Sequence, residues 1–574
     1  MDSIITQQKG HTNMKFSEMP YSRVDLDALA SEFDRLTEKV KSAASADDVI
    51  AAFREQEKLS VHAETMASLC YVRNSIDTRD KFYVSEQEFY DTNLPAFQEH
   101  SQNLMIAFCE SPYRKELEGL VGELVFKNIE MDLKTFSPEI IDELGRENKL
   151  VSDYQKLVAS AKIDFDGKQL NISQLGAYKQ NPDREVRHAA YQAESGFYMS
   201  HAAKLDEIFD ELVKVRTEIA KKLGFKSFTE LAYLRRTRNC YDPEMVAAFR
   251  RQVVEKLVPV VVELKKKQAE RIGLAPEDMR IYDDVYSFGE GNPKPLGTPD
   301  DIMAAGKRMY EEMSPETAEF INFMYDNELL DLVAKDGKAV GGYCTDFPEY
   351  KSPFIFSNFN GTSGDVDVLT HEAGHAFASY MTRNFEFREN SQPTMESCEC
   401  HSMSMEFFAW KWLHLFYGDD VARAKYMHLE SALIFIPYGC MVDHFQHIVY
   451  DNPDLTPAER HNEWKKLEAV YRPYMNFGDV DFYASGRGWQ RQLHIYHYPF
   501  YYIDYCLAQT VSLEFWSLSQ QDYKDAWERY LRFVREGGKK TFVGLCETAG
   551  IGLPFNDGAL DSVSAAASKY LAEN

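Results

Sequence analysis

The chain has little cysteine and no long apolar run. Its nine cysteines in 574 residues are an odd number, thinly spread from Cys70 to Cys546. Secreted disulfide scaffolds use dense cysteine frameworks, so we expect a reducing, cytoplasmic compartment. The most apolar stretch, residues 429–442, contains Pro437 and Gly439 and is shorter than the roughly 18 to 20 residues of a membrane span. Because the N-terminal stretch also lacks the apolar segment of an export signal, we expect no membrane association.

Basic residues are also scarce relative to acidic ones. The sequence has 64 Lys and Arg against 91 Asp and Glu, a formal net charge of −27. Such a chain repels nucleic-acid backbones and anionic membrane surfaces, so neither is an expected partner. Its 44% hydrophobic and 27% charged residues are typical of a globular protein. At about 100 to 200 residues per domain the length suggests about three units, but large folds often exceed that size. We predict two lobes: residues 1–200, of which 1–13 form an extension, and residues 201–574.

Helical patterns dominate most of the chain. Leu- and Ala-rich acidic segments predict helices in the N-terminal lobe, and an apolar stripe with helical spacing follows it. A glycine ends that stripe, as expected of a helix C-terminus, and a proline in the next segment predicts a kink. The predicted segments are residues 26–43, 116–130, 205–223 with Gly224, and 245–267 with Pro259.

The amino-acid composition changes between residues 337 and 365, where Gly, Pro, aromatic and β-branched residues predict short strands and turns. We expect residues 352–361 to form an edge strand, because such a strand can pair with an extended peptide without demanding a particular sequence. Helical character returns at Asp365. The predicted fold is therefore mainly α, with a small β-sheet beside the next helix.

The residues that carry chemistry follow this sheet directly. His371, Glu372 and His375 form an H-E-x-x-H motif. Positions i and i+4 share one helix face, so both imidazoles can reach one metal ion, and Glu372 lies beside its open position. With this composition such a pattern is expected by chance about 0.06 times. The alternative is a surface helix that happens to carry two histidines.

A catalytic zinc site needs a third protein ligand and an open position for water. The helix-compatible segment 392–412 offers Glu396, Glu399 and Glu406 on one face. His401 and Cys400 point elsewhere on that helix, and a site made with Cys398 and Cys400 would be typical of structural zinc. Spacing alone leaves the three glutamates open.

At these positions the chain resembles the M3 family of zinc metallopeptidases, which includes thimet oligopeptidase and oligoendopeptidase F, and it is most similar to the oligoendopeptidase F branch. The motif H-E-A-G-H, with Gly374, matches that family, and so do two glutamates seven residues apart. The resemblance implies that Glu399 is the third ligand and that Glu406 does not bind the metal itself but contacts a ligand histidine. Further similar segments are MKFSEMPY from Met14, RTEIAKKLGFKSFTEL from Arg216, GKAVGGY and SPFIFSNF.

An aromatic cluster occupies residues 481–509, next to a loop with Gly486 and Gly488. Tyrosine hydroxyls and histidine N–H groups can stabilise an oxyanion, although an aromatic helix can equally be core. The family resemblance implies that His494, Tyr498, Tyr502 and Tyr505 face the zinc and bind the substrate carbonyl. Tyr501 and His497 are the competing positions, because Pro499 and the run PFYYIDY depart from the thimet-type pattern.

The resemblance implies a two-lobed, helical metallopeptidase with a deep substrate channel that admits oligopeptides. We expect a zinc-dependent endopeptidase with one Zn²⁺ per chain held by His371, His375 and Glu399. It would hydrolyse internal bonds of short oligopeptides through metal-activated water, with Glu372 as the general base.

Three alternatives remain at this stage. A zinc exopeptidase of the helical carboxypeptidase type shares the motif, and end-blocked peptides distinguish it because only an endopeptidase cuts them. A non-catalytic peptide-binding protein on the same scaffold is disfavoured by the intact Glu372. A structural zinc or helical interaction protein would show no chelator-sensitive hydrolysis.

Overall fold

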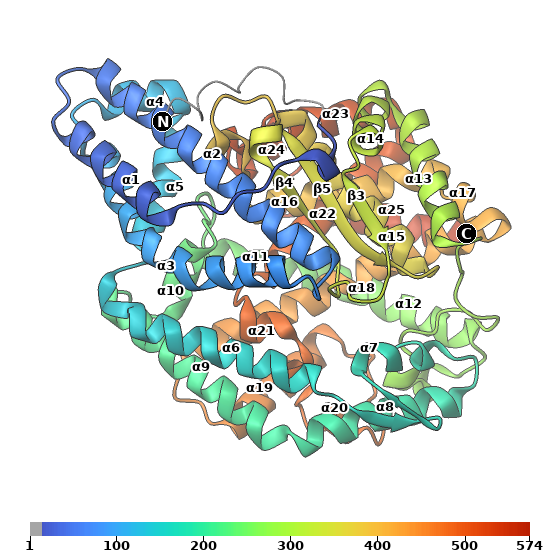
Figure 1. Cartoon of the computed structure of the whole chain (residues 1–574). Helices are drawn as coiled ribbons and strands as arrows, with labels where there is room; N and C mark the ends of the chain where they lie inside the picture. Colours follow the sequence, from blue (N-terminus) through green and yellow to red (C-terminus); the bar gives the residue numbers. More distant parts are fainter. Residues whose placement is uncertain (1–13, 574) are drawn as a thin grey trace. The chain divides into compact units, whose positions relative to one another are not determined.

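The computed structural model describes residues 14–573, which are mainly helical with two small β-sheets (Figure 1). The predicted extension, residues 1–13, lies outside the described residues. No helix between residues 14 and 573 is long and apolar enough to cross a membrane. The mainly α fold with a small sheet, predicted from the sequence, is confirmed.

The chain forms two compact units, each assembled from three stretches of sequence. Of the described residues, the first unit comprises 14–133, 294–421 and 518–551, and the second comprises 134–293, 422–517 and 552–573. Residue 200, where we predicted the lobe boundary, is the last residue of α8 inside the second unit. One boundary in the sequence cannot divide the chain into these units, because each unit is built from three separate segments.

The first unit contains the N-terminal helices, a three-stranded sheet and the helices around it. Its elements are α1 (Leu26–Lys41), α2 (Ala46–Ile76), α3 (Lys81–Glu110), α4 (Arg114–Val121), α5 (Glu123–Leu133), α13 (Pro299–Met313), α14 (Pro315–Asp326), β3 (Leu330–Val333), β4 (Tyr343–Phe347), β5 (Ser352–Phe359), α15 (Ser363–Thr382), α16 (Met395–Phe408), α17 (His414–Tyr417), α23 (Tyr523–Arg535) and α24 (Phe542–Ala549).

The second unit is helical apart from one short hairpin. Its elements are α6 (Ile141–Ala159), β1 (Ile163–Phe165), β2 (Lys168–Leu170), α7 (Ile172–Leu175), α8 (Arg184–Ser200), α9 (Ala202–Lys222), α10 (Phe228–Arg235), α11 (Pro243–Gln252), α12 (Val258–Arg271), α18 (Val421–Asp451), α19 (Pro457–Tyr471), α20 (Asp481–Ala484), α21 (Leu493–His497), α22 (Tyr502–Gln521) and α25 (Ala559–Glu573). Helix α22 continues into the first unit at residue 518.

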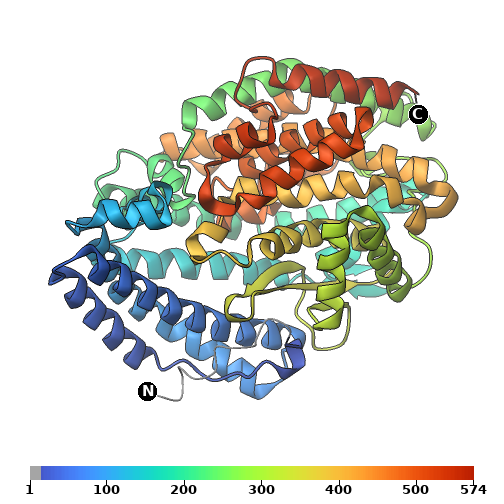
Figure 2. The same ribbon diagram turned by 90° about the horizontal axis from the view of Figure 1, so that it is seen from above.

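Helices α1, α2 and α3 run side by side at the start of the first unit (Figures 1 and 2). Helix α1 confirms the helix predicted over residues 26–43. The Asp25 side chain caps it by accepting a hydrogen bond from the Ala28 N–H at 3.0 Å, and Phe33 is one of the residues on its buried face. The segment 116–130 is helical as predicted, except that it forms two helices instead of one. Gly122, with φ +100°, takes a conformation that helices exclude and divides this region into α4 and α5.

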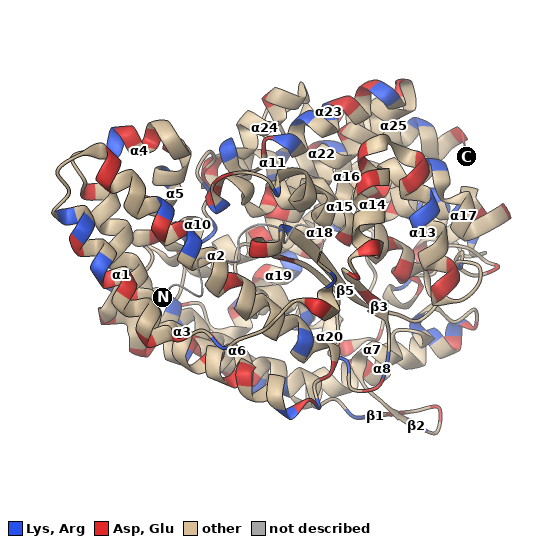
Figure 3. Cartoon of the chain, turned by 45° about the horizontal axis from the view of Figure 1, so that its top comes forward, with Lys and Arg blue, Asp and Glu red and all other residues tan. Residues whose placement is uncertain are grey.

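Charges of both signs are interspersed along α1 and α4 (Figure 3). On α4 the Arg114 Nε donates to Glu118 at 2.7 Å, one turn further along the helix. Such partly exposed pairs stabilise a helix by only about 0.3 to 0.5 kcal/mol each. The acidic excess of the whole chain is therefore not gathered on these two helices.

The three-stranded sheet of the first unit has the order β3-β5-β4. β5 pairs with β3 in parallel and with β4 antiparallel, with Cys344 opposite Ile355. The prediction that residues 352–361 form an edge strand is therefore wrong, because β5 has a neighbour on both sides. The buried sequence SPFIFSNF explains this, since a central strand has little need of polar alternation. β4 is the edge strand beside α15.

Helix α15 packs against this sheet and is buried on most of its other faces. The Phe377 ring lies 5.6 Å from that of Phe320 on α14 and 6.0 Å from that of Trp527 on α23. Burial of each such side chain stabilises the fold by about 1.5 to 3 kcal/mol. The residues of the H-E-x-x-H motif thus lie on a helix that is fixed by packing.

The second unit bears out two helix predictions. The stripe over residues 205–223 lies in α9, which is followed by Gly224 with φ +84°. The segment 245–267 is interrupted as predicted from Pro259, although the irregularity precedes the proline as a π-helical turn over Val253–Leu257. That turn shifts the hydrogen-bond pattern so that Pro259, which lacks an N–H, falls within the first turn of α12.

Candidate active site

The first unit brings together three of the residues predicted to bind metal. His371 and His375 on α15 face Glu399 on α16, and their ligand atoms all lie within 4.8 Å of one another. The Glu399 Oε2 is 3.4 Å from His371 Nε2 and 3.6 Å from His375 Nε2. Among the described residues, this is the one group of three or more His, Cys, Asp and Glu side chains arranged in this way.

The helix that carries both histidines has a fixed beginning. The Asp365 carboxylate accepts hydrogen bonds from the backbone N–H groups of Asn360, Gly361 and Thr362, at 2.9, 2.6 and 3.2 Å. These bonds close the turn between β5 and α15. The cap therefore fixes the residue at which α15 begins. Because the helical repeat is constant, it also fixes the direction in which the side chains of His371 and His375 point.

Close contact between α15 and α16 sets the spacing of the ligands. A Cβ atom on Gly374 would lie 2.6 Å from Ser402 Cα and 2.7 Å from the His401 carbonyl oxygen. Only glycine allows these backbones to approach so closely. Close packing therefore explains why the fourth residue of the motif is glycine. The same close approach of the two helices brings Glu399 within reach of both histidines.

Glu406 orients the first histidine. Its Oε1 is 2.7 Å from His371 Nδ1, so the imidazole donates from Nδ1 and leaves the Nε2 lone pair on the side of Glu399. Although burial opposes the charged form, hydrogen bonds to Glu399 and Glu406 raise the pKa of His371, so metal binding displaces the proton that Nε2 otherwise shares with Glu399. Burial lowers the pKa of His375 to about 4, so that this imidazole is neutral and able to bind a cation.

These donors fit a zinc ion. Two imidazole nitrogens and one carboxylate oxygen form the set that catalytic zinc uses, and the histidine side chains keep 24% and 21% of their surface exposed, which leaves the site open on one side. Burial raises the pKa of the Cys398 thiol to about 12, so the cysteines of this segment are protonated and do not compete as thiolate ligands.

The other candidates from this segment lie outside the group. The Glu396 Oε1 accepts a hydrogen bond from the Thr394 hydroxyl at 2.7 Å. His401 is buried, and its ring meets that of Phe533 at 5.5 Å. Sequence spacing could not say which of three glutamates binds the metal. The position of α16 against α15 distinguishes them, because it places Glu399 alone beside both histidine Nε2 atoms.

Glu372 lies next to the edge strand. The backbone of Cys344 on β4 hydrogen-bonds to its carboxylate, and burial raises the pKa of Glu372 to about 7. This role of β4 was not predicted, because residues 352–361 were expected to form the edge strand. A divalent cation nearby would oppose the shift and favour the carboxylate.

The predicted histidine and tyrosines gather in the second unit. The ring of His494 is 4.9 Å from that of Tyr502 and 6.0 Å from those of Tyr501 and Tyr505. Tyr498 is more distant at 6.5 Å and is 42% exposed.

Gln492 distinguishes the two histidines of this cluster. It accepts a hydrogen bond from the Tyr438 hydroxyl at 2.9 Å and donates to His494 Nδ1 at 2.8 Å. This arrangement places the His494 proton on Nε2. His497 instead stacks on Tyr498 at 3.8 Å, and its Nδ1 is 3.2 Å from Gln155.

Two buried arginines that the sequence analysis did not single out as site residues hold the backbone of this cluster. Arg216 pairs with Glu147 at 2.6 Å and donates to the Tyr496 carbonyl. Arg238 donates to the Phe500 carbonyl and pairs with Asp504 at 2.9 Å. Phe500 itself has φ +64°, an unusual conformation for a phenylalanine, and these contacts maintain it. A buried arginine in the apolar stripe of α9 is the signal that could have revealed Arg216, whereas Arg238 follows the end of α10 and carries no such pattern.

The chain matches two family models. Residues 16–136 match the peptidase M3 N-terminal domain, and residues 177–294 and 312–564 match peptidase family M3. Oligopeptidase PepF from Bacillus subtilis (strain 168) is 22% identical over 549 residues, which cover 89% of this chain and 78% of that protein.

Solved structures are similar over nearly the whole chain. A structure of PZ peptidase A with an inhibitor is 48% identical, covers 98% of this chain and 99% of its own, and has a TM-score of 0.92. A structure described as oligoendopeptidase F from Bacillus anthracis str. Ames is 46% identical, covers 98% of each chain and has a TM-score of 0.87. The chain belongs to peptidase family M3 and is a metallo-oligopeptidase similar to oligoendopeptidase F, a hydrolase of short peptides.

Proposed function

We propose that this enzyme is an endopeptidase that holds one Zn²⁺ between His371, His375 and Glu399. The convergence of these three side chains within 4.8 Å is the observation that supports the proposal most strongly. Bound zinc would act as a Lewis acid that polarises the scissile carbonyl and lowers the pKa of water. All three residues lie between positions 201 and 574, which we propose as the catalytic part of the chain.

Glu372 is the proposed general base and acid. Its carboxylate takes a proton from the attacking water as the new C–O bond forms. The same proton then passes to the amine nitrogen as the peptide C–N bond breaks. Burial raises the pKa of Glu372 and so makes its carboxylate a stronger base than an ordinary one, while a bound cation would oppose the shift and keep the group ionised before water attacks.

His494 and its neighbouring tyrosines are the proposed donors to the carbonyl oxygen as that oxygen gains charge. The Nε2–H that Gln492 selects in His494 is one such donor. Burial raises the pKa of Tyr502 well above its usual value, so the hydroxyl stays protonated and able to donate. Each well-placed donor of this kind contributes roughly 3 to 4 kcal/mol to the transition state. We propose Tyr498 and Tyr505 for the same role.

Edge strand β4 is the proposed docking element for the peptide backbone. Among the described strands it ends the β3-β5-β4 sheet and has a strand partner on one side alone, and its Cys344 backbone contacts Glu372. Pairing through main-chain hydrogen bonds binds peptides without demanding a specific sequence.

We further propose a cytoplasmic location and no nucleic-acid partner. All nine cysteines are free thiols, five of them buried, which favours a reducing compartment. The net charge of −27 opposes binding to a polyanion.

Endopeptidase action is tested with a library of peptides of mixed length, each blocked at both ends. Mass spectrometry of the products from the zinc-loaded enzyme should show internal cleavage that a chelator abolishes. Products that arise only from peptides with a free terminus would instead identify an exopeptidase.

A further inference from the structure

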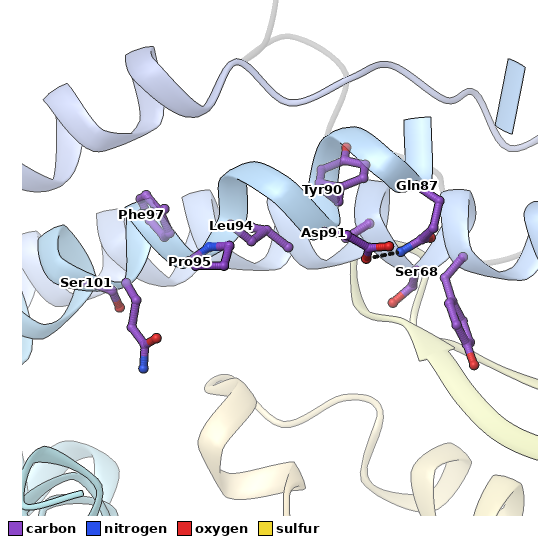
Figure 4. Close-up of a pocket in the computed structure, with 11 residues that line it drawn as sticks. Ser68, Gln87, Tyr90, Asp91, Leu94, Pro95, Phe97 and Ser101 are labelled. Atoms are coloured by element: carbon purple, nitrogen blue, oxygen red, sulfur yellow. Dashed lines mark hydrogen bonds between the residues drawn. The ribbon is translucent and has the colours of Figure 1, made fainter. Parts of the chain in front are cut away.

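A groove of about 700 Å³ lies between α2 and α3 in the first unit, outside the cluster of metal ligands (Figure 4). Side chains from both helices line it, among them Ser68 and Tyr71 from α2 and Gln87, Asp91, Leu94 and Pro95 from α3. In the close-up, the labelled residues of α3 are spread along the helix, with Tyr90 and Phe97 on one side of the ribbon and Asp91 and Pro95 on the other.

The groove offers hydrogen-bond acceptors and one negative charge beside apolar surface. Pro95 lies inside α3 and has no N–H, so the Asp91 carbonyl cannot accept the usual helical hydrogen bond. The Asp91 carboxylate is exposed and receives one hydrogen bond, from Gln87 Nε2 to Oδ1 at 2.8 Å. None of the described residues that line the groove is Lys, Arg or His. This lining complements a cation on an aliphatic stem.

Direct contacts connect the groove to the catalytic carboxylate. The Tyr71 ring, at the edge of the groove, lies 5.1 Å from the ring of Tyr343. Tyr343 is the first residue of β4, and the backbone of the next residue, Cys344, hydrogen-bonds to Glu372. A peptide that pairs with β4 and continues beyond Tyr343 would pass the end of the strand that lies near Tyr71.

We propose that the groove between α2 and α3 is a remote subsite that binds a lysine or arginine side chain of the peptide substrate. An extended chain advances ~3.3 Å per residue, so the subsite lies several residues from the scissile bond. The aliphatic stem packs on Leu94 and Pro95, and the cationic end meets Asp91. This inference rests on the proposed roles of Glu372 and β4.

The test uses end-blocked, internally quenched peptides that share one cleavable bond. A single lysine is moved outward from two to six residues on either side of that bond, and norleucine at the same position is the neutral reference. The ratio of kcat/KM for lysine over norleucine cancels any general effect on the enzyme. We expect this ratio to rise roughly two- to five-fold at one distance on one side, the range of a partly exposed ion pair, and to fall as salt is added.

Asp91→Asn should abolish the lysine preference, whereas Glu99→Gln should keep it, because Glu99 is an exposed acid on the same helix that does not line the groove. A preference that persists in Asp91→Asn, or a wild-type enzyme with no preference at any distance, would overturn the subsite. Ser68→Trp should also slow the cleavage of peptides that reach the groove more than that of shorter ones, and an equal effect on both would count against it. Failure of the underlying mechanism is distinguishable, since it would appear as loss of all end-blocked cleavage in wild type.

Discussion

Gly374→Ala is the substitution that most directly tests how the ligand spacing is built. The new Cβ would lie 2.6 Å from Ser402 Cα, whereas ordinary contact begins at 3.4 Å, so α15 and α16 must separate by about 0.8 Å. Glu399 lies on α16 one turn before Ser402 and moves with it. Metal sites tolerate deviations of only about 0.2 Å in ligand distance.

Two energies act on this variant. Overpacking destabilises by about 1 to 3 kcal/mol, and the better helix propensity of alanine offsets about 1 kcal/mol. We therefore expect a net loss of up to about 2 kcal/mol in the free energy of unfolding and a roughly 10- to 100-fold weaker zinc affinity. Urea unfolding and competition with a chelator measure the two effects separately.

Gly145→Ala is the matched control. A Cβ atom at this position on α6 has nothing within 4 Å, so it should only gain helix propensity and leave zinc affinity unchanged. If Gly374→Ala bound zinc and turned over peptide as the wild type does, close packing at Gly374 would not be what sets the distance between Glu399 and the histidines.

Three further predictions concern Glu406, Glu57 and His494. Glu406→Ala should weaken zinc binding about 10- to 100-fold in a chelator competition, because His371 loses its Nδ1 partner; unchanged affinity would refute this role. Burial and Glu389 raise the pKa of Glu57 to about 8, so the native state holds an extra proton and loses stability as the pH rises from about 4.5 to 8. Glu57→Gln cannot ionise and should gain about 3 kcal/mol more over wild type at pH 8 than at pH 5 in urea unfolding, whereas a gain independent of pH would contradict the assignment. His494→Ala should lower kcat by about 10² to 10³ with zinc content unchanged; wild-type kcat would exclude His494 as a donor.

Local spacing predicted the parts of the site that depend on a helix alone. His371 and His375 share a face because of the 3.6-residue repeat, and the same repeat placed Glu399 and Glu406 on one face of the next helix. Apolar stripes likewise predicted α1 and α9, since burial of one helix face is encoded in neighbouring residues.

Contacts between distant segments could not be predicted in this way. The register of α16 against α15 depends on the close approach at Gly374, which the spacing of Glu396 and Glu399 does not contain. β5 was expected at the sheet edge, but its position depends on pairing with β3 and β4 on either side. Arg216 is similar, because its role arises from Tyr496, which is 280 residues away in the sequence.

Zinc content and turnover of Glu372→Gln, measured on the same preparation, test the central claim most directly. Glutamine keeps the size of the side chain but cannot take a proton from water. We predict one zinc per chain, as in the wild type, together with loss of internal cleavage of end-blocked peptides. Turnover at the wild-type rate by a zinc-loaded Glu372→Gln enzyme would contradict the assignment of Glu372 as the catalytic base.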